Sequence, residues 1–143
     1  MVFNQLFDGI SMKLNQVFGD GYKVYSDKVR QGLKEPCFFI KLLNPSQSPL
    51  LGSRRFRTNS FDIHYFPKAN ESSEDVNEVV ESLFEALEYI TLPNGDLVRG
   101  TNLHAENVDG VVHFFVNYNL FTRKDEVHEP MEDLTVQAGT KGW

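Results

Sequence analysis

The stretch Phe61-Asp-Ile-His-Tyr-Phe-Pro67 carries the clearest strand signal in the chain. In an extended strand, alternate side chains point to opposite faces, so Phe61, Ile63 and Tyr65 share one face, and the polar Asp62 and His64 share the other with Phe66. Proline closes the stretch because it lacks the amide proton that a continuing ladder needs. We therefore predict a strand from about residue 55 to 66 that is apolar on one face and mixed aromatic and polar on the other.

Two other stretches have the same two-sided pattern. They are Cys37 to Leu43, which follows Pro36, and Val111 to Thr122. Asp109-Gly110 separates the second of these from Leu97 to Val108, and glycine readily takes the positive φ that a tight hairpin turn requires. The pattern predicts a sheet in which at least this pair of strands is antiparallel.

Two amphipathic helices are expected to cover the apolar face of the sheet. Apolar residues three and four positions apart mark the first, which Gly19-Asp-Gly21 ends: Phe3, Leu6, Phe7, Ile10, Leu14, Val17 and Phe18. The second follows the capping box Ser72-Ser-Glu-Asp75, and its apolar stripe is Val76, Val79, Val80, Leu83, Phe84, Leu87 and Ile90.

The remaining segments complete the predicted organisation. Tyr22 to Ser26 is a short strand candidate, and Asn44-Pro-Ser-Gln-Ser-Pro49 is predicted to be a loop. We predict an α+β fold with a mixed, largely antiparallel sheet of about four to five strands and two main helices on one face. Residues 1–124 form one domain, and residues 125–143 form a C-terminal tail that is flexible or ordered by a partner. We expect this tail and residues 44–53 to be mobile in a free monomer.

Composition excludes several classes of protein. The 143 residues carry a net charge of −6, which disfavours general binding to nucleic acid. The apolar runs are too short to span a bilayer, and the N-terminus lacks the features of a secretory signal. Cys37 is the single cysteine, so neither an intrachain disulfide nor a zinc site built from several cysteines can form. We expect the protein to remain in the cytoplasm where it is made.

No motif for catalysis or cofactor binding is present. The chain lacks a phosphate-binding glycine loop, a dinucleotide fingerprint, a nucleophile elbow and a zinc-binding His-Glu-x-x-His helix. His64 and His113 could approach each other on neighbouring strands and, with Asp62, form a metal or acid–base cluster. We favour the simpler interpretation, in which these histidines pack among aromatic side chains, and we treat Cys37 as a small buried apolar residue. The prediction is therefore no enzyme, no catalytic residue, no metal and no cofactor.

The second face of the sheet is a candidate interaction surface. Two helices can cover only one face, which leaves aromatic and polar side chains together on the other: Phe39, Lys41, Asp62, His64, Phe66, His113, Phe115 and Asn117. Such a composition is common at protein interfaces. Either this face contacts other subunits, or the C-terminal segment folds back over it.

The run Arg54-Arg-Phe-Arg57 is the only dense basic segment of the chain. Arginines at a strand edge commonly remain solvated and discourage unwanted edge pairing. A guanidinium group can also pair with the carboxylates of a neighbouring copy, or with the phosphates of DNA passing through a pore.

The order of several phrases resembles a known family. These phrases are Tyr22 to Tyr25, Val29-Arg-Gln-Gly-Leu33, Pro36-Cys-Phe-Phe-Ile40, the arginine-rich entry to Phe61–Pro67, Leu87-Glu-Tyr-Ile90, Arg99-Gly-Thr101 and Asp109-Gly-Val-Val-His-Phe114. In that order they resemble the tail terminator proteins of myophage-like prophages in Gram-positive bacteria, over roughly residues 1–122. The family has no catalytic motif, so no residue receives a role from the resemblance.

The resemblance implies a structural virion protein. Such a protein forms a ring, expected to be a hexamer, on the head-proximal end of the tail tube, where it ends tube polymerisation and offers a surface for head docking. Its implied partners are its own copies, the tail tube protein and head–tail connector proteins, with DNA passing through the lumen and no membrane contact. Its implied location is the virion tail, reached from the host cytoplasm. The candidate interface residues are Phe39, Arg54, Arg55, Arg57, His64, Phe66, His113 and Phe115.

Two alternatives remain open from the sequence. One is another head–tail connector or completion protein, and the other is a cytoplasmic small-molecule-binding or enzymatic α+β domain. The last alternative predicts that His64, His113 and carboxylates gather around a concave pocket, whereas a terminator predicts flat and extended interfaces.

Overall fold

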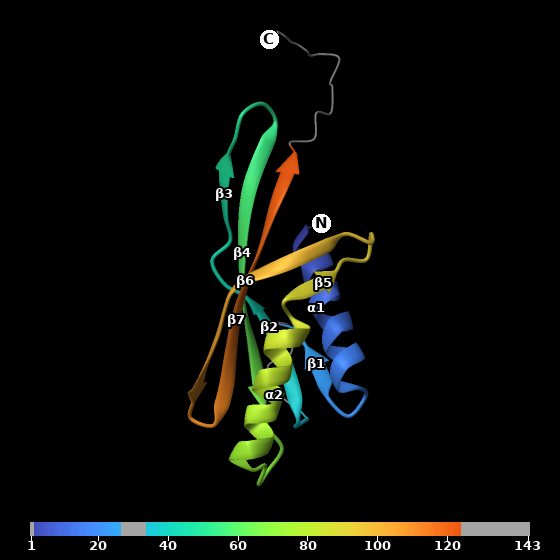
Figure 1. Ribbon diagram of the computed structural model, residues 1–143, viewed down its shortest axis with the longest axis vertical. Helices are drawn as coiled ribbons and strands as arrows, with labels where there is room; N and C mark the ends of the chain where they lie inside the picture. Colours follow the sequence, from blue (N-terminus) through green and yellow to red (C-terminus); the bar gives the residue numbers. More distant parts are fainter. Residues whose placement is uncertain (1, 27–33, 124–143) are drawn as a thin grey trace.

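The computed structural model describes residues 2–26 and 34–123, and it has the predicted α+β fold. The described residues form two helices and a long, twisted sheet, whose arrangement Figure 1 shows. The elements in chain order are α1 (Val2–Phe18), β1 (Lys23–Tyr25), β2 (Cys37–Leu42), β3 (Ser46–Pro49), β4 (Arg54–Phe66), α2 (Ser73–Ala86), β5 (Tyr89–Thr91), β6 (Leu97–Val108) and β7 (Val111–Arg123). The predicted tail, residues 125–143, lies outside the described residues.

The sheet has seven strands in the described part of the chain, more than the predicted four to five. Its order is β1-β2-β4-β7-β6-β5, and β3 pairs with β4 beside β2. Only β1 and β2 run parallel, and every other pair is antiparallel. The prediction of a mixed, largely antiparallel sheet is confirmed. The two short strands β3 and β5 account for the higher number.

The prediction of a loop at Asn44–Pro49 was wrong for most of this segment. Ser46 to Pro49 pair with β4, from Ser46 opposite Thr58 to Pro49 opposite Arg55. All four residues of β3 are exposed, so this edge strand has no apolar face that the sequence could reveal. Pro49 is tolerated because it is the last residue of an edge strand.

The end of the second helix was also predicted too late. The helix ends at Ala86, Leu87 is its C-cap, and Tyr89 to Thr91 form β5 against β6. Ile90 is buried as predicted, but it lies on this strand. The change follows from long-range contacts at the cap, because the Tyr118 hydroxyl donates a hydrogen bond to the Leu87 carbonyl oxygen (2.6 Å) and the Gly100 amide donates to that of Glu88 (2.6 Å).

Three predicted turn and cap signals are confirmed. Ser72 Oγ accepts a hydrogen bond from the Asp75 amide (3.1 Å) at the start of α2. Gly19, with φ of 84°, follows the last residue of α1. Asp109 (53°) and Gly110 (81°) both have positive φ in the β6–β7 hairpin, as expected for a tight turn between twisted strands.

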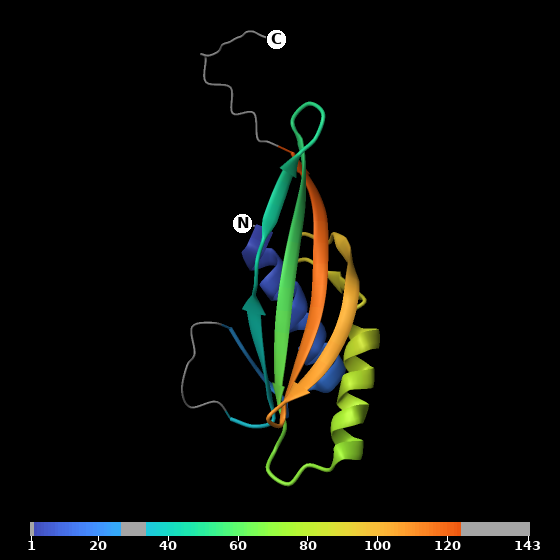
Figure 2. The same ribbon diagram turned by 90° about the vertical axis from the view of Figure 1, so that its left-hand side faces the viewer.

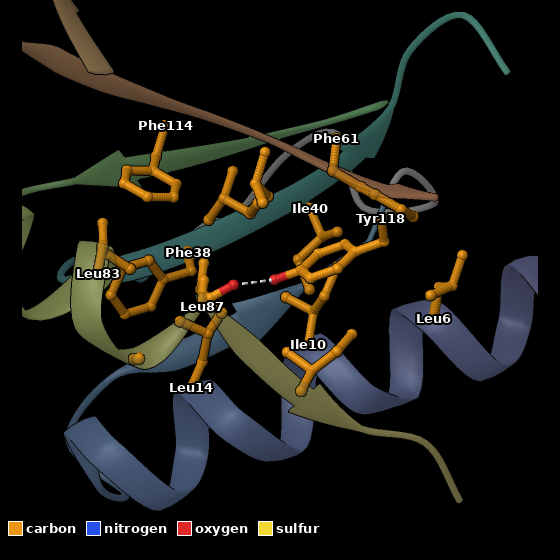
Figure 3. Close-up of a cluster of buried hydrophobic side chains, with 14 of the residues drawn as sticks. Leu6, Ile10, Leu14, Phe38, Ile40, Phe61, Leu83, Leu87, Phe114 and Tyr118 are labelled. Carbon is orange, nitrogen blue, oxygen red and sulfur yellow. Dashed lines mark hydrogen bonds between the residues drawn. The ribbon is translucent and has the colours of Figure 1, made fainter. Parts of the chain in front are cut away.

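The core lies between the helices and the apolar face of the sheet (Figure 3). All of the sheet residues predicted to face the helices are buried: Phe38, Ile40, Phe61, Ile63, Tyr65, Val112, Phe114, Val116 and Tyr118. Leu6, Ile10 and Leu14 of α1 and Leu83 of α2 meet them. Two residues of the predicted helical stripes are exposed, Val17 to 46% and Phe84 to 39%. Val17 lies in the last turn of α1, and the Phe84 ring packs against that of Phe114 in a T-shaped arrangement, with the ring centroids 5.0 Å apart.

Both helices lie on one face of the sheet, and the opposite face carries no helix in the described part of the chain (Figures 1 and 2). β3, the first half of β4 and the end of β7 project beyond the helices. None of the helices within residues 2–26 and 34–123 is long and apolar enough to cross a membrane.

Gly100 provides a direct test of the packing between α2 and the sheet. A Cβ atom at this position would lie 2.7 Å from the Leu87 carbonyl oxygen and 2.8 Å from Val116 Cγ2. Because such overpacking typically costs about 1–3 kcal/mol, Gly100→Ala should lower the free energy of unfolding by that amount in urea denaturation. Gly21→Ala is the matched control, since nothing lies within 4 Å of its Cβ position. Equal stability of the two variants would contradict this packing.

A candidate interface on the open face of the sheet

We call the face of the sheet opposite the helices the open face. Its central residues come from four neighbouring strands: Phe39 and Lys41 of β2, Asp62, His64 and Phe66 of β4, His113, Phe115 and Asn117 of β7, and His104 and Glu106 of β6. Figure 2 views the sheet from this side, with the helices behind it. Apart from Asp62, all of these residues are partly or fully exposed.

The register of the strands brings these side chains together. Residues directly opposite in neighbouring strands share a face and lie close to each other. His64 of β4 lies opposite His113 of β7 and Phe39 of β2. Asp62 lies opposite Phe115 on β7 and Lys41 on β2. All eight candidate residues of the predicted second face therefore belong to one surface.

Asp62 is the polar centre of the open face. It is only 7% exposed, and its Oδ2 lies 3.0 Å from Nε2 of His64 and 3.0 Å from Nδ1 of His113. Oδ2 accepts a hydrogen bond from each imidazole when that nitrogen carries its proton. Oδ1 is buried and has no hydrogen-bond partner in the described part of the chain. Burial raises the pKa of Asp62, but the hydrogen bonds and charges of the two histidines outweigh it, so the pKa is lower than usual.

Aromatic rings surround this polar centre. The rings of His64 and His113 are 4.3 Å apart, Phe39 lies 5.7 Å from His64, and Phe66 lies 6.2 Å from it on the same strand. On the other side, His104 stacks on Phe115 at 4.8 Å with an angle of 19° between the ring planes. The result is a band of rings that crosses β2, β4, β7 and β6.

His104 was missed by the sequence analysis. The pairing of β6 with β7 shifts between Thr101 and His104, which interrupts the two-residue alternation along β6. Such an irregularity leaves no signal in the sequence, so the face on which His104 lies could not be predicted from its neighbours.

From the sequence, a packing role for the histidines was favoured over a metal or acid–base cluster. The structure shows that both descriptions have a basis, because the histidines contact aromatic rings and also converge on one carboxylate. Asp62, His64 and His113 are the only group in the described part of the chain whose side chains could jointly hold a metal ion. Cys37 is buried, and burial raises the pKa of its thiol to about 11, with a smaller contribution from Glu35, so the thiolate is scarce at neutral pH.

The arginine run is divided between the two faces of β4. Arg57 donates hydrogen bonds to Gln47 Oε1 (2.8 and 3.2 Å) and lies 5.5 Å from the ring of Phe3 on α1. Arg54 is exposed and lies 5.4 Å from the ring of Phe121. By alternation, Arg55 shares the side of Arg57. Within the described residues, none of the three lies within ion-pair distance of a carboxylate. The run therefore does not form one basic patch, because Arg54 lies on one side of β4 and Arg55 and Arg57 lie on the other. Of the three, Arg54 is the most available to a partner.

A second apolar surface, which the sequence analysis did not identify, lies where β3, β4 and β7 project beyond the helices. We call it the hairpin end, and its members are Leu50, Leu51, Arg54, Phe56 and Phe121. Leu51 is 93% exposed and Phe121 is 64% exposed. The Leu50 amide donates a hydrogen bond to the Arg54 carbonyl oxygen (2.9 Å), and the Phe56 and Phe121 rings are 5.1 Å apart. Exposed apolar side chains on a closed hairpin are suited to contact with another protein.

Four hollows in the described part of the surface lie away from the histidine cluster, for example between Phe18, Tyr22 and Glu71, and between α1 and β1. None of them is lined by His64 or His113. The cluster thus lies on a sheet surface of the kind that a protein partner covers.

An exposed, partly aromatic surface of this kind is typical of subunits that assemble. Comparison with known families shows which kind of assembly this is. The family model for phage tail terminator proteins matches residues 5–130. The chain therefore belongs to the phage tail terminator family, as the order of its phrases indicated. A search of curated proteins finds no match.

Family membership defines the general role of the protein. Members of this family are structural proteins of the phage tail and do not form a class of enzymes. The protein therefore belongs to the virion tail and interacts with other tail or head–tail proteins.

Replacing Asp62 tests its role in holding the open face together. Asp62→Asn keeps the shape but removes the charge that both imidazoles contact, so we expect the free energy of unfolding to fall by about 1–3 kcal/mol in metal-free buffer. Glu106→Gln is the control, because Glu106 is exposed on the same face opposite His113 and makes no hydrogen bond among the described residues. A loss of stability in Glu106→Gln as large as that in Asp62→Asn would contradict a special role for Asp62.

Proposed function

We propose that this protein forms a ring that caps the head-proximal end of the phage tail tube, ends tube polymerisation and presents the surface on which the head docks. Family membership supports the tail location. The main structural support for assembly into a ring is the open face, where no helix of the described chain covers the aromatic and histidine side chains. An exposed surface of this composition favours burial against another protein.

Ring closure imposes a specific demand on each subunit. A ring forms through heterologous contacts, in which one surface of a subunit meets a different surface of the next. Arg54, Phe56 and Phe121 of the hairpin end lie on the same side of the sheet as His64 and His113. The hairpin end and the patch around Asp62 are still two separate surfaces, because they lie toward opposite ends of β4 and β7. We propose that they are the contact surfaces between neighbouring subunits, with Phe39, His64, Phe66, His113 and Phe115 on one side of the contact and the hairpin end on the other.

The finer features of the assembly follow from the family resemblance. We expect a hexameric ring that contacts the tail tube protein and the head–tail connector proteins and lets DNA pass through its lumen. Arg54 is the residue of the arginine run most suited to a partner carboxylate or a DNA phosphate, because it is exposed and makes no ion pair among the described residues. The alternative in the same class is another head–tail connector or completion protein, which would bind connectors and leave tube ends free.

The open-face contact is tested by placing a charge at its centre. Phe115→Asp and Phe66→Asp should reduce the assembled mass to that of a single chain and abolish capping of preassembled tail tubes, because a buried, unpaired carboxylate strongly opposes association. Light scattering and negative-stain images of the mixture measure both effects. Met12→Asp is the control, since Met12 is exposed on α1. Unchanged assembly by folded Phe115→Asp and Phe66→Asp proteins would refute the proposed interface.

The two halves of the arginine run should differ in their effect on assembly. Arg54→Glu reverses an exposed charge at the hairpin end, so we expect it to weaken assembly about tenfold or more. Arg57→Glu removes the hydrogen bonds to Gln47, so its main effect should be on stability, which thermal unfolding measures separately. If Arg57→Glu weakened assembly more than Arg54→Glu at equal stability, this assignment of the two residues would be wrong.

A further inference from the structure

Three side chains on the open face present metal-ligating atoms to one point. Asp62 offers a carboxylate oxygen, His64 offers Nε2 and His113 offers Nδ1, and these atoms all lie within 4.8 Å of one another. Asp62 Oδ2 lies 3.0 Å from each of the two nitrogens. The three residues come from the two longest strands of the sheet, and no exposed loop contributes to the group.

The backbone holds these three positions rigidly. β4 and β7 pair along twelve consecutive positions, and the group lies within this ladder, with His64 directly opposite His113 and Asp62 two residues before His64. The other sides of β4 and β7 are covered by β2 and β6. A ligand set on central strands keeps its geometry better than one on loops, which favours ion binding without a large ordering cost.

The charge of Asp62 is incompletely balanced by the chain itself. The carboxylate is almost fully buried, and its Oδ1 has no hydrogen-bond partner in the described part of the chain. Lys41 lies opposite Asp62 on β2 but forms no ion pair with it. Glu106, opposite His113 on β6, places a further negative charge nearby. A buried carboxylate requires a nearby cation or several hydrogen bonds. Here a bound cation would supply the positive charge that the neighbouring side chains do not place beside Asp62.

We propose that Asp62, His64 and His113 bind a divalent transition-metal ion of the kind that prefers imidazole ligands, such as Zn²⁺. Zinc binds histidine nitrogen and carboxylate oxygen at about 2.0–2.2 Å, which places neighbouring ligand atoms of a tetrahedral site about 3.3–3.5 Å apart. The two 3.0 Å separations from Asp62 Oδ2 need a small expansion, and the two imidazole nitrogens, which lie within 4.8 Å of each other, must reach the same spacing. Mg²⁺ and Ca²⁺ fit less well, because they prefer sites made wholly of oxygen.

The proposed site would keep an open coordination position. Three protein ligands leave the fourth position of a tetrahedral ion unfilled, and the two imidazoles are partly exposed, with about a fifth of each side chain accessible. Both imidazoles lie on the open face, so a fourth ligand would reach the ion from that side. All three ligands come from a single chain, so metal binding does not depend on the proposed ring. The metal site can therefore be tested separately from the proposed ring-capping function.

Zinc titration of the full chain tests the proposal. The protein is first treated with EDTA, dialysed and then titrated with Zn²⁺ in a calorimeter, and we expect saturable binding of one ion per chain. His113→Ala and Asp62→Asn should each weaken binding by about tenfold or more, since the first removes a ligand nitrogen and the second replaces a charged carboxylate ligand by a neutral amide. His104→Ala is the matched control, because His104 lies on the same face but stacks on Phe115 outside the cluster. Its binding should equal that of the unmodified chain.

Two further readouts separate metal binding from loss of fold. Co²⁺ bound in place of Zn²⁺ should give the visible absorption bands of a four-coordinate ion, and these should be missing in His113→Ala. Zn²⁺ should also raise the melting temperature of the unmodified chain and of His104→Ala, but not that of His113→Ala. Absence of saturable binding to the unmodified chain would overturn the proposal. So would equal zinc affinity in the unmodified chain, His113→Ala and a second variant, His64→Ala.

Discussion

The antiparallel pairing of β4 with β7 is the constraint on which the rest of this structure depends. Arg54 to Tyr65 pair in unbroken register with Arg123 to Val112, so both faces of the sheet are set by a single alignment. One face supplies Phe61, Phe114 and Tyr118 to the core, and the other brings His64 against His113. A slip of one residue would exchange the two faces of a strand, exposing the core residues and burying the polar ones.

This pairing links stability to the proposed function. On the helix side, the Tyr118 hydroxyl fixes the end of α2 through the Leu87 carbonyl, and Gly100 allows the close approach of the strand. On the open face, the same strands hold Asp62 between two histidines inside a band of aromatic rings. Both surfaces that we propose for ring contacts therefore use β4 and β7. Substitutions at their exposed side chains should affect assembly with little effect on the core beneath.

Much of this arrangement could be predicted from the sequence, because strand alternation and helical spacing are local. The buried face, the capping box at Ser72 and the hairpin at Asp109-Gly110 were all predicted from residues close together in the chain. β3 could not be predicted, since its four residues are all exposed and include no large apolar side chain, and the strand exists only because the edge of β4 is available. The convergence of His64 and His113 on Asp62 was raised from the sequence only as the less favoured alternative, because it depends on the register between strands about fifty residues apart.

The central claim is that the open face becomes a contact between subunits when the protein caps a tail tube. Electron cryomicroscopy of tail tubes incubated with the protein tests this claim most directly. We predict a closed ring at one end of each tube. In this ring, the open face around His64 and Phe115 of every subunit is buried against the hairpin end of its neighbour. A ring whose subunits join through α1 and α2, with the open face exposed to solvent, would contradict it.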